Sequence, residues 1–160
     1  MTLIDPMQIG DRELTEDEET YKENILDHYK HPRNTGTLSA CTVHHHEHNP
    51  LCGDRIEIFL KFTDETCTDA KFVGQGCAIS QASMSMLSEQ LKGKSVEDIK
   101  RITSDDILNL LGIPVGIVRM KCALLSLKTV HMGISHWENF PSSAAAQPHS
   151  GKFAEKGEWI

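Results

Sequence analysis

The sequence predicts an α+β domain with helices packed on one face of an antiparallel sheet. Two observations lead to this fold class. Segments with alternating apolar residues come first along the chain, and segments with helical periodicity follow them. The length of 160 residues suits one domain with a single core.

The strand-like part of the chain reads as a hairpin. Apolar and polar residues alternate over residues 55–62, with the apolar positions at Ile56, Ile58, Leu60 and Phe62. Asp64 and Glu65 supply a turn, and residues 67–73 return as the second strand. Residues 39–48 are ambiguous, but they suit a further extended segment.

Helical spacing of apolar residues predicts five helices, at residues 21–30, 78–91, 96–99, 105–111 and 117–133. Pro32 follows the end of the first helix, and Gly93 follows the end of the second. Thr103 or Ser104 is expected to cap the fourth helix.

Charge and composition divide the chain into three parts. Most of the net charge of −7 lies in residues 1–20, which hold seven acidic residues and one arginine. We therefore predict an acidic flexible arm over residues 1–20, a folded domain over residues 21–136 and a mobile C-terminal tail over residues 137–160. The acidic balance argues against nucleic acid as a partner.

Nothing in the sequence predicts a membrane or secreted protein. No apolar run is long enough to span a bilayer, and no basic stretch followed by an apolar core opens the chain. We therefore expect a cytoplasmic location. In a reducing compartment, five cysteines are expected to be metal ligands, catalytic groups or buried small residues rather than a disulfide framework.

Three short segments contain residue types that can bind metals. Cys52 and Asp54 flank a glycine just before the first strand, so a thiolate and a carboxylate can face one cation. Cys77 falls at the expected start of a helix, and Cys122 follows Arg119 and Lys121 on the last helix. A helix N-terminus and nearby positive charge both favour a thiolate, so we expect lowered pKa values for the Cys77 and Cys122 thiols.

Each of these segments has a structural alternative, in which the cysteines are buried small residues and Asp54 is a turn former. Together, three cysteines and one aspartate at the ends of elements would complete a tetrahedral site for zinc or iron.

The same segments resemble the signature motifs of the U-type iron–sulfur cluster assembly scaffolds, which comprise the ISC-type scaffold, the SUF-type U protein and the NifU N-terminal domain. The motifs are Asn49–Asp54 (NPLCGD), Gly74–Ser80 (GQGCAIS) and Arg119–Cys122 (RMKC). His28–Asn34 (HYKHPRN) is similar to the segment that follows the first helix of this family. The resemblance covers about residues 21–133 and implies a small three-stranded antiparallel sheet with helices on one face.

The resemblance implies that Cys52, Asp54, Cys77 and Cys122 are the metal or cluster ligands. Members of the family accept sulfur from a cysteine desulfurase, build a transient [2Fe–2S] cluster and pass it to acceptor apo-proteins. Some SUF-type members hold zinc and relay sulfur as a persulfide. The leading expectation is a non-enzymatic scaffold, with Cys52 as persulfide acceptor and Cys122 as the alternative acceptor. Its rivals are a zinc-dependent sulfurtransferase and a zinc-stabilised interaction module.

The chain combines features of two subtypes. Lys121 precedes the third cysteine, as in SUF-type members, whereas ISC-type scaffolds carry histidine there. The segment from Cys77 to Cys122 is too short for the SUF-type insertion. Pro114 is displaced from its place in the chaperone-recruiting motif of ISC systems, and residues 116–119 stand there instead.

The other candidate ligands are weaker. His44, His46 and His48 would share one face of a strand, either gathering metal near the site or forming an exposed polar edge. Cys41 and Cys67 match no ligand position, so we expect structural or surface thiols.

Overall fold

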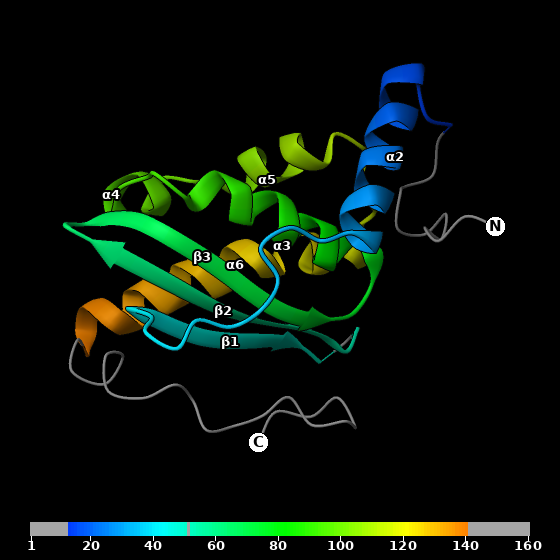
Figure 1. The fold of residues 1–160 in the computed structure, drawn as a ribbon. Helices are drawn as coiled ribbons and strands as arrows, with labels where there is room; N and C mark the ends of the chain where they lie inside the picture. Colours follow the sequence, from blue (N-terminus) through cyan, green and yellow to red (C-terminus); the bar gives the residue numbers. More distant parts are fainter. Residues whose placement is uncertain (1–12, 51, 141–160) are drawn as a thin grey trace.

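The structure is a computed structural model that describes residues 13–50 and 52–140. Predictions for residues 1–12, 51 and 141–160 lie outside the described residues. Elements are labelled as in Figure 1. The strands are β1 (Val43–Asn49), β2 (Asp54–Thr63) and β3 (Thr66–Gln75). The helices are α2 (Glu16–Lys30), α3 (Ala78–Leu91), α4 (Val96–Lys100), α5 (Ser104–Leu111) and α6 (Ile117–Asn139).

The three strands form one antiparallel sheet in the order β1-β2-β3, and α3 and α6 lie on one of its faces (Figure 1). The predicted α+β class is therefore confirmed. The turn between β2 and β3 uses Asp64 and Glu65, both with positive φ, at 51° and 64°. Positive φ at both central residues matches the right-handed twist of the paired strands.

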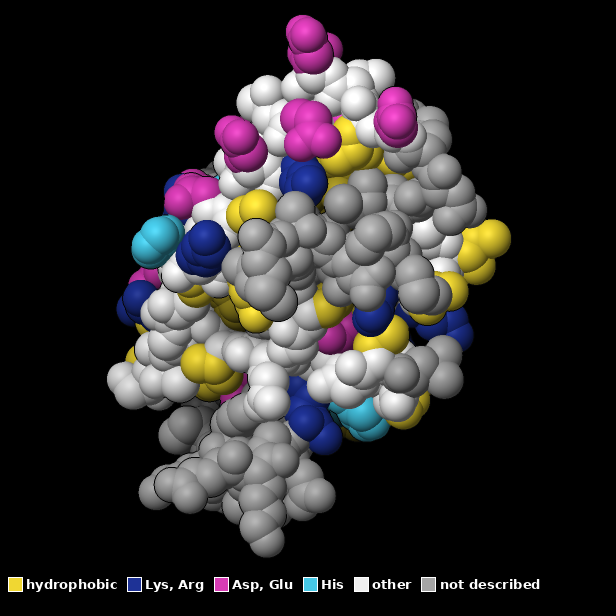
Figure 2. All heavy atoms as spheres, turned by 90° about the vertical axis from the view of Figure 1, so that its right-hand side faces the viewer, with side chains coloured by type: hydrophobic (Ala, Val, Ile, Leu, Met, Phe, Trp, Pro, Cys, Tyr) yellow, Lys and Arg dark blue, Asp and Glu magenta, His cyan; other side chains and the backbone are white. Residues whose placement is uncertain are grey.

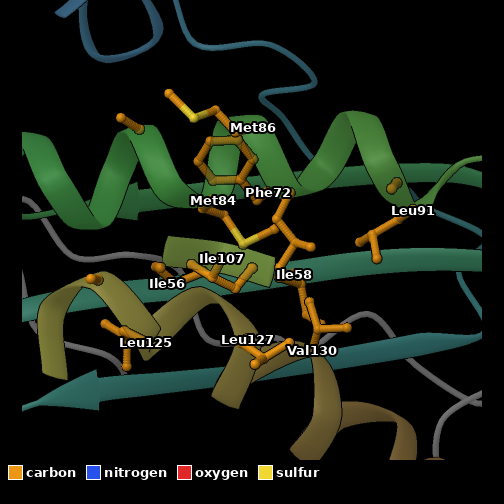
Figure 3. Close-up of a cluster of buried hydrophobic side chains, with 14 of the residues drawn as sticks. Ile56, Ile58, Phe72, Met84, Met86, Leu91, Ile107, Leu125, Leu127 and Val130 are labelled. Atoms are coloured by element: carbon orange, nitrogen blue, oxygen red, sulfur yellow. The ribbon is translucent and has the colours of Figure 1, made fainter. Parts of the chain in front are cut away.

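The core fills the space between the sheet and the two helices that cover it. Figure 3 shows Ile56 and Ile58 of β2 in one cluster with core side chains that include Met84 of α3 and Val130 of α6. All four side chains are almost fully buried. The helices α2 and α5 form an outer layer, because α2 packs on α3 while α5 packs on both α3 and α6. Of the described helices, none is both long and apolar enough to cross a membrane.

The first helix begins earlier than the sequence analysis predicted. The α2 helix starts at Glu16 rather than at residue 21, so residues 16–20 of the segment predicted as an acidic flexible arm are helical. A capping box stabilises this start. Glu18 N donates to the Thr15 side chain, and the Glu18 side chain accepts from Thr15 N.

The last helix ends later than predicted, at Asn139 instead of residue 133. The Trp137 ring stacks on the Phe62 ring of β2, with centroids 5.5 Å apart and an interplanar angle of 4°. The Lys100 ammonium lies 3.1 Å from a Glu138 carboxylate oxygen. Residues 137–139 are therefore helical, and Trp137 and Glu138 contact β2 and α4.

Replacing Trp137 tests whether the end of α6 packs on the sheet. Trp137→Ala removes an aromatic contact and buried apolar area between α6 and β2, so the free energy of unfolding should fall by about 1–2 kcal/mol. Met132 lies on the same helix with 47 % of its surface exposed, and Met132→Ala serves as the control. Chemical denaturation of both variants measures the difference. Equal stability of the two variants would show that Trp137 contributes nothing to the domain.

Candidate metal centre

The three predicted cysteines and Asp54 meet at one end of the sheet. Cys52 lies in the turn between β1 and β2, and Asp54 is the first residue of β2. Cys77 is the N-cap of α3, and Cys122 lies near the start of α6. The β2–β3 pairing brings Arg55 opposite Gln75, so the start of β2 and the end of β3 are held together at this edge.

The turn that carries Cys52 is closed by backbone hydrogen bonds. Cys52 N and Gly53 N both donate to Asn49 O, at 3.2 Å and 2.8 Å. Gly53 has a φ of 73°, a conformation that residues with a side chain rarely adopt. The predicted role of Gly53 in directing the chain between Cys52 and Asp54 therefore has a structural basis.

Asp54 is fully buried and is held by the start of α3. Cys77 N donates to Asp54 Oδ1 at 2.8 Å, and Cys77 Sγ lies 3.8 Å from Asp54 Oδ2. Gly76, with a φ of 151°, makes room for this carboxylate. A Cβ at Gly76 would lie 2.2 Å from Asp54 Oδ1, which is too close for any side chain.

The sulfur atoms complete the cluster. Cys52 Sγ lies 3.0 Å from Cys122 Sγ. The potential ligand atoms of Cys52, Asp54 and Cys122 lie within 4.8 Å of one another, the only such group of three found in residues 13–50 and 52–140. Cys77 adjoins this group through Asp54. The structure thus brings all four predicted residues together, and their role as ligands stays a prediction.

The protonation of the thiols differs from the sequence-based expectation. Burial raises the pKa of the Cys77 thiol, although hydrogen bonds from Ser80 oppose the rise. Burial also raises the pKa of Cys122, and hydrogen bonds to Asp54 and Cys52 raise it further. The expected lowering is therefore wrong in the metal-free protein, because desolvation and the Asp54 charge outweigh the helix N-terminus.

Of the two basic residues before Cys122, only Arg119 has a hydrogen bond to its sulfur. Arg119 Nη1 lies 4.0 Å from Cys122 Sγ. Burial alone would lower the pKa of the Arg119 guanidinium. The hydrogen bond to Cys122 and the negative charge that Cys77, Cys122 and Cys52 carry as thiolates raise this pKa overall. Lys121 is exposed and lines a neighbouring groove instead. The expectation named Arg119 and Lys121 together, and the three-residue spacing on a helix explains why Arg119 is the one in contact with Cys122.

The groove lies between the end of β1 and α6 and has a volume of about 350 Å³. Its lining combines apolar side chains with basic ones: His48, Asn49, Pro50, Met120, Lys121, Leu124, Leu125 and Lys128. One member, Asn49, also reaches the metal centre, since its Nδ2 lies 3.8 Å from Cys122 Sγ. The groove therefore adjoins the cluster through Asn49.

The histidine run does not join the centre in the described part of the chain. No histidine belongs to the group of potential ligands. His44 Nε2 instead contacts Glu57 Oε1, and the His44 ring stacks on Phe59 with centroids 4.6 Å apart. His48 is exposed and lines the groove.

The two remaining cysteines lie apart from the four clustered residues. Cys67 is 1 % exposed, and burial raises the pKa of its thiol to about 11. Cys41 is half-buried, and burial raises the pKa of its thiol too. Neither belongs to the group formed by Cys52, Asp54 and Cys122, and their role as structural or surface thiols stays a prediction.

The donor set fits a transition metal. Three thiols and one carboxylate give the S₃O combination that zinc and iron both accept. A thiol loses its proton when it coordinates a metal. A cation bound among these side chains would therefore balance the negative charge of the buried thiolates.

Comparison with known proteins identifies the family. Residues 20–144 match the NifU-like N terminal domain model. A zinc-dependent sulfurtransferase, SufU of Bacillus subtilis, is 39 % identical over 135 residues, covering 74 % of this chain and 91 % of that protein. The iron–sulfur cluster assembly scaffold protein IscU of Rickettsia prowazekii is 35 % identical over 127 residues, covering 74 % and 92 %.

A solved structure supports the fold. The N-terminal NifU-like protein of Brucella abortus superposes with a TM-score of 0.63 over 79 % of this chain and 99 % of that one, at 22 % identity. The chain belongs to the NifU-like N-terminal domain family, the family of iron–sulfur cluster assembly scaffolds. The resemblance predicted from the three cysteine motifs is confirmed.

Gly76 provides a test of the geometry of the centre. A Cβ in Gly76→Ala must displace the Asp54 carboxylate, so zinc affinity should fall about tenfold or more. Gly93 also has a positive φ, but a Cβ there meets no atom within 4 Å, so Gly93→Ala is a matched control. Competition with a chromogenic chelator measures the affinity of each variant. Wild-type affinity in Gly76→Ala would contradict the role of Asp54 as a ligand.

Proposed function

We propose that this protein is a scaffold for iron–sulfur cluster assembly. It accepts sulfur from a cysteine desulfurase, assembles a [2Fe–2S] cluster on Cys52, Asp54, Cys77 and Cys122, and transfers the cluster to acceptor apo-proteins. The observation that carries the proposal is the convergence of three thiols on one buried carboxylate at the end of the sheet. Iron and sulfide are the cargo of such a centre rather than permanent parts of it.

Cys52 is the proposed acceptor of sulfur. It lies on a turn and is half-buried, whereas Cys122 is fully buried on α6. The Cys52 thiolate attacks the terminal sulfur of the desulfurase persulfide, the S–S bond of that persulfide breaks, and the desulfurase cysteine leaves as a thiolate. The exchange makes one S–S bond and breaks one, so it requires no external oxidant or reductant. Cys122 is the alternative acceptor, only 3.0 Å away.

Asp54 is proposed to make the centre labile. A carboxylate is a harder donor than a thiolate and matches iron less well among sulfur ligands. Its departure would open a position for a cysteine of an acceptor protein. The hydrogen bond from Cys77 N would hold the released carboxylate in place, so the site need not unfold to exchange its cargo.

The second candidate function is a zinc-dependent sulfurtransferase, which relays persulfide without building a cluster. Lys121 favours this candidate, because SUF-type members carry lysine before the third cysteine. The Bacillus subtilis relative at 39 % identity carries this activity in its name. Both functions use the same four residues, and the resident metal distinguishes them.

The acidic surface suits a protein partner rather than nucleic acid, and the free thiols suit a cytoplasmic location. Figure 2 shows acidic side chains gathered at the top of one face, where α2 begins. Such a surface repels nucleic acid. All five cysteines are free thiols, which suits a reducing compartment.

The proposed function predicts both a sulfur intermediate and a cluster. After anaerobic incubation with a cysteine desulfurase, cysteine, ferrous iron and a thiol reductant, which reduces persulfide sulfur to the sulfide of the cluster, the protein should show the visible absorption of a [2Fe–2S] cluster. Without iron and without the reductant, mass spectrometry should find one added sulfur on Cys52. Tightly bound zinc, with sulfur transfer but no cluster absorption, would favour the sulfurtransferase. Absence of both sulfur transfer and cluster absorption would contradict the proposal.

Replacement of Asp54 tests the labile ligand. In the scaffold, Asp54→Ala should slow the transfer of the cluster to an acceptor and prolong the life of the cluster absorbance. In a zinc sulfurtransferase, the same substitution should mainly weaken zinc binding. Asp69 is a carboxylate of β3 outside the group of potential ligands, so Asp69→Ala is the control. Faster cluster loss in Asp54→Ala, at unchanged stability, would falsify the labile role.

A further inference from the structure

Asn49, the last residue of β1, lies between the groove and the buried sulfur of Cys122. Its side chain lines the groove, and its Nδ2 lies 3.8 Å from Cys122 Sγ. Asn49 is 6 % exposed, and Cys122 is fully buried. Cys122 does not line the groove itself, whereas Asn49, which contacts its sulfur, does.

The same residue also holds the opposite side of the centre. Its backbone carbonyl accepts the hydrogen bonds of Cys52 N and Gly53 N that close the turn. Across the sheet, Asn49 pairs with Asp54. One residue thus contacts the segment that carries Cys52 through its backbone and the helix that carries Cys122 through its side chain.

The surroundings of Asn49 give its amide a polar role. The neighbouring walls of the groove include the apolar side chains of Pro50, Met120 and Leu124. An apolar residue of similar size would pack equally well at this position. Burying an amide, in contrast, costs free energy unless the amide is hydrogen-bonded. The contact of Asn49 Nδ2 with Cys122 Sγ, at 3.8 Å, is one hydrogen bond of this amide.

We propose that Asn49 is a positioning residue whose side-chain amide orients Cys122 Sγ towards Cys52 and covers it from the groove. The inference rests on the proposed function in one respect, namely that Cys122 is a metal ligand. An N–H donated to a ligating sulfur fixes its direction and balances part of its negative charge. Partners of this kind outside the ligand set commonly change metal affinity by about tenfold or more.

Two substitutions separate the effect of the hydrogen bond from Asn49 to Cys122 from the effect of shielding Cys122 Sγ from the groove. Asn49→Ala removes both the amide and the bulk, whereas Asn49→Leu removes the amide and keeps a side chain of similar size. Both leave the backbone carbonyl that closes the turn. Zinc affinity, measured by chelator competition, should fall about tenfold or more in both variants.

Thiol labelling of the metal-free protein distinguishes positioning from general loosening. In Asn49→Ala, iodoacetamide should alkylate Cys122 faster than in wild type, because the groove then extends to its sulfur. In Asn49→Leu, Cys122 should stay slow. Cys67 is an internal control, since it is 1 % exposed at the start of β3 and should stay slow in both. Peptide mass mapping gives each rate separately.

Wild-type zinc affinity in both variants would overturn the proposal. So would a parallel increase of Cys67 and Cys122 labelling in Asn49→Ala together with unchanged zinc affinity in Asn49→Leu. The outcome for the proposed function is separate. If wild-type protein itself fails to bind zinc or iron, the ligand set is wrong, and the labelling of Cys122 in Asn49→Ala still decides whether Asn49 covers that sulfur.

Discussion

The hydrogen bond from Cys77 N to the buried Asp54 carboxylate joins the parts of the candidate centre. It connects the first residue of β2 to the first turn of α3, two segments that the chain separates by the whole β2–β3 hairpin. Gly76 permits this approach, because any side chain there would collide with the carboxylate. With Asp54 fixed, the turn that carries Cys52 and the helix that carries Cys122 bring their sulfurs to the same place.

This arrangement has an electrostatic consequence. Four groups that can each carry a negative charge share a small and largely buried volume, and burial alone disfavours their ionised forms. The raised pKa values of Cys77 and Cys122 express this cost in the metal-free protein. Arg119 offsets part of it from one side, and a bound cation would offset it from the centre. Under the proposed function, the thiolates of this centre would hold the metal, and the carboxylate ligand would keep its release possible.

Much of the fold could be predicted from the sequence because its signals are local. Alternating apolar residues located the β2–β3 hairpin, and α3 begins and ends at the predicted residues. The two helix ends that differ most from the prediction have different causes. The start of α2 follows from the capping box of Thr15 and Glu18, a local signal that could have been recognised. The end of α6 depends on the packing of Trp137 against Phe62 of a distant strand, which no local pattern reports.

The candidate site also has features that the sequence predicts and features that depend on the folded structure. The proximity of the four residues could be predicted, because the three motifs are specific and their order agrees with one family. The protonation of the thiols could not, because burial in the folded domain reverses the effect of the helix N-terminus and the nearby positive charge. The position of Asn49 against Cys122 depends on the packing of β1 on α6.

X-ray absorption spectroscopy of the metal-loaded protein tests the central claim most directly, because it counts the atoms that bind the metal. For the zinc-loaded form, we predict about three sulfur atoms at about 2.3 Å and one oxygen atom at about 2.0–2.2 Å. The count of sulfur atoms should fall by one in Cys52→Ser, Cys77→Ser and Cys122→Ser. A zinc shell made only of nitrogen and oxygen atoms, or one that none of these substitutions changes, would contradict the account.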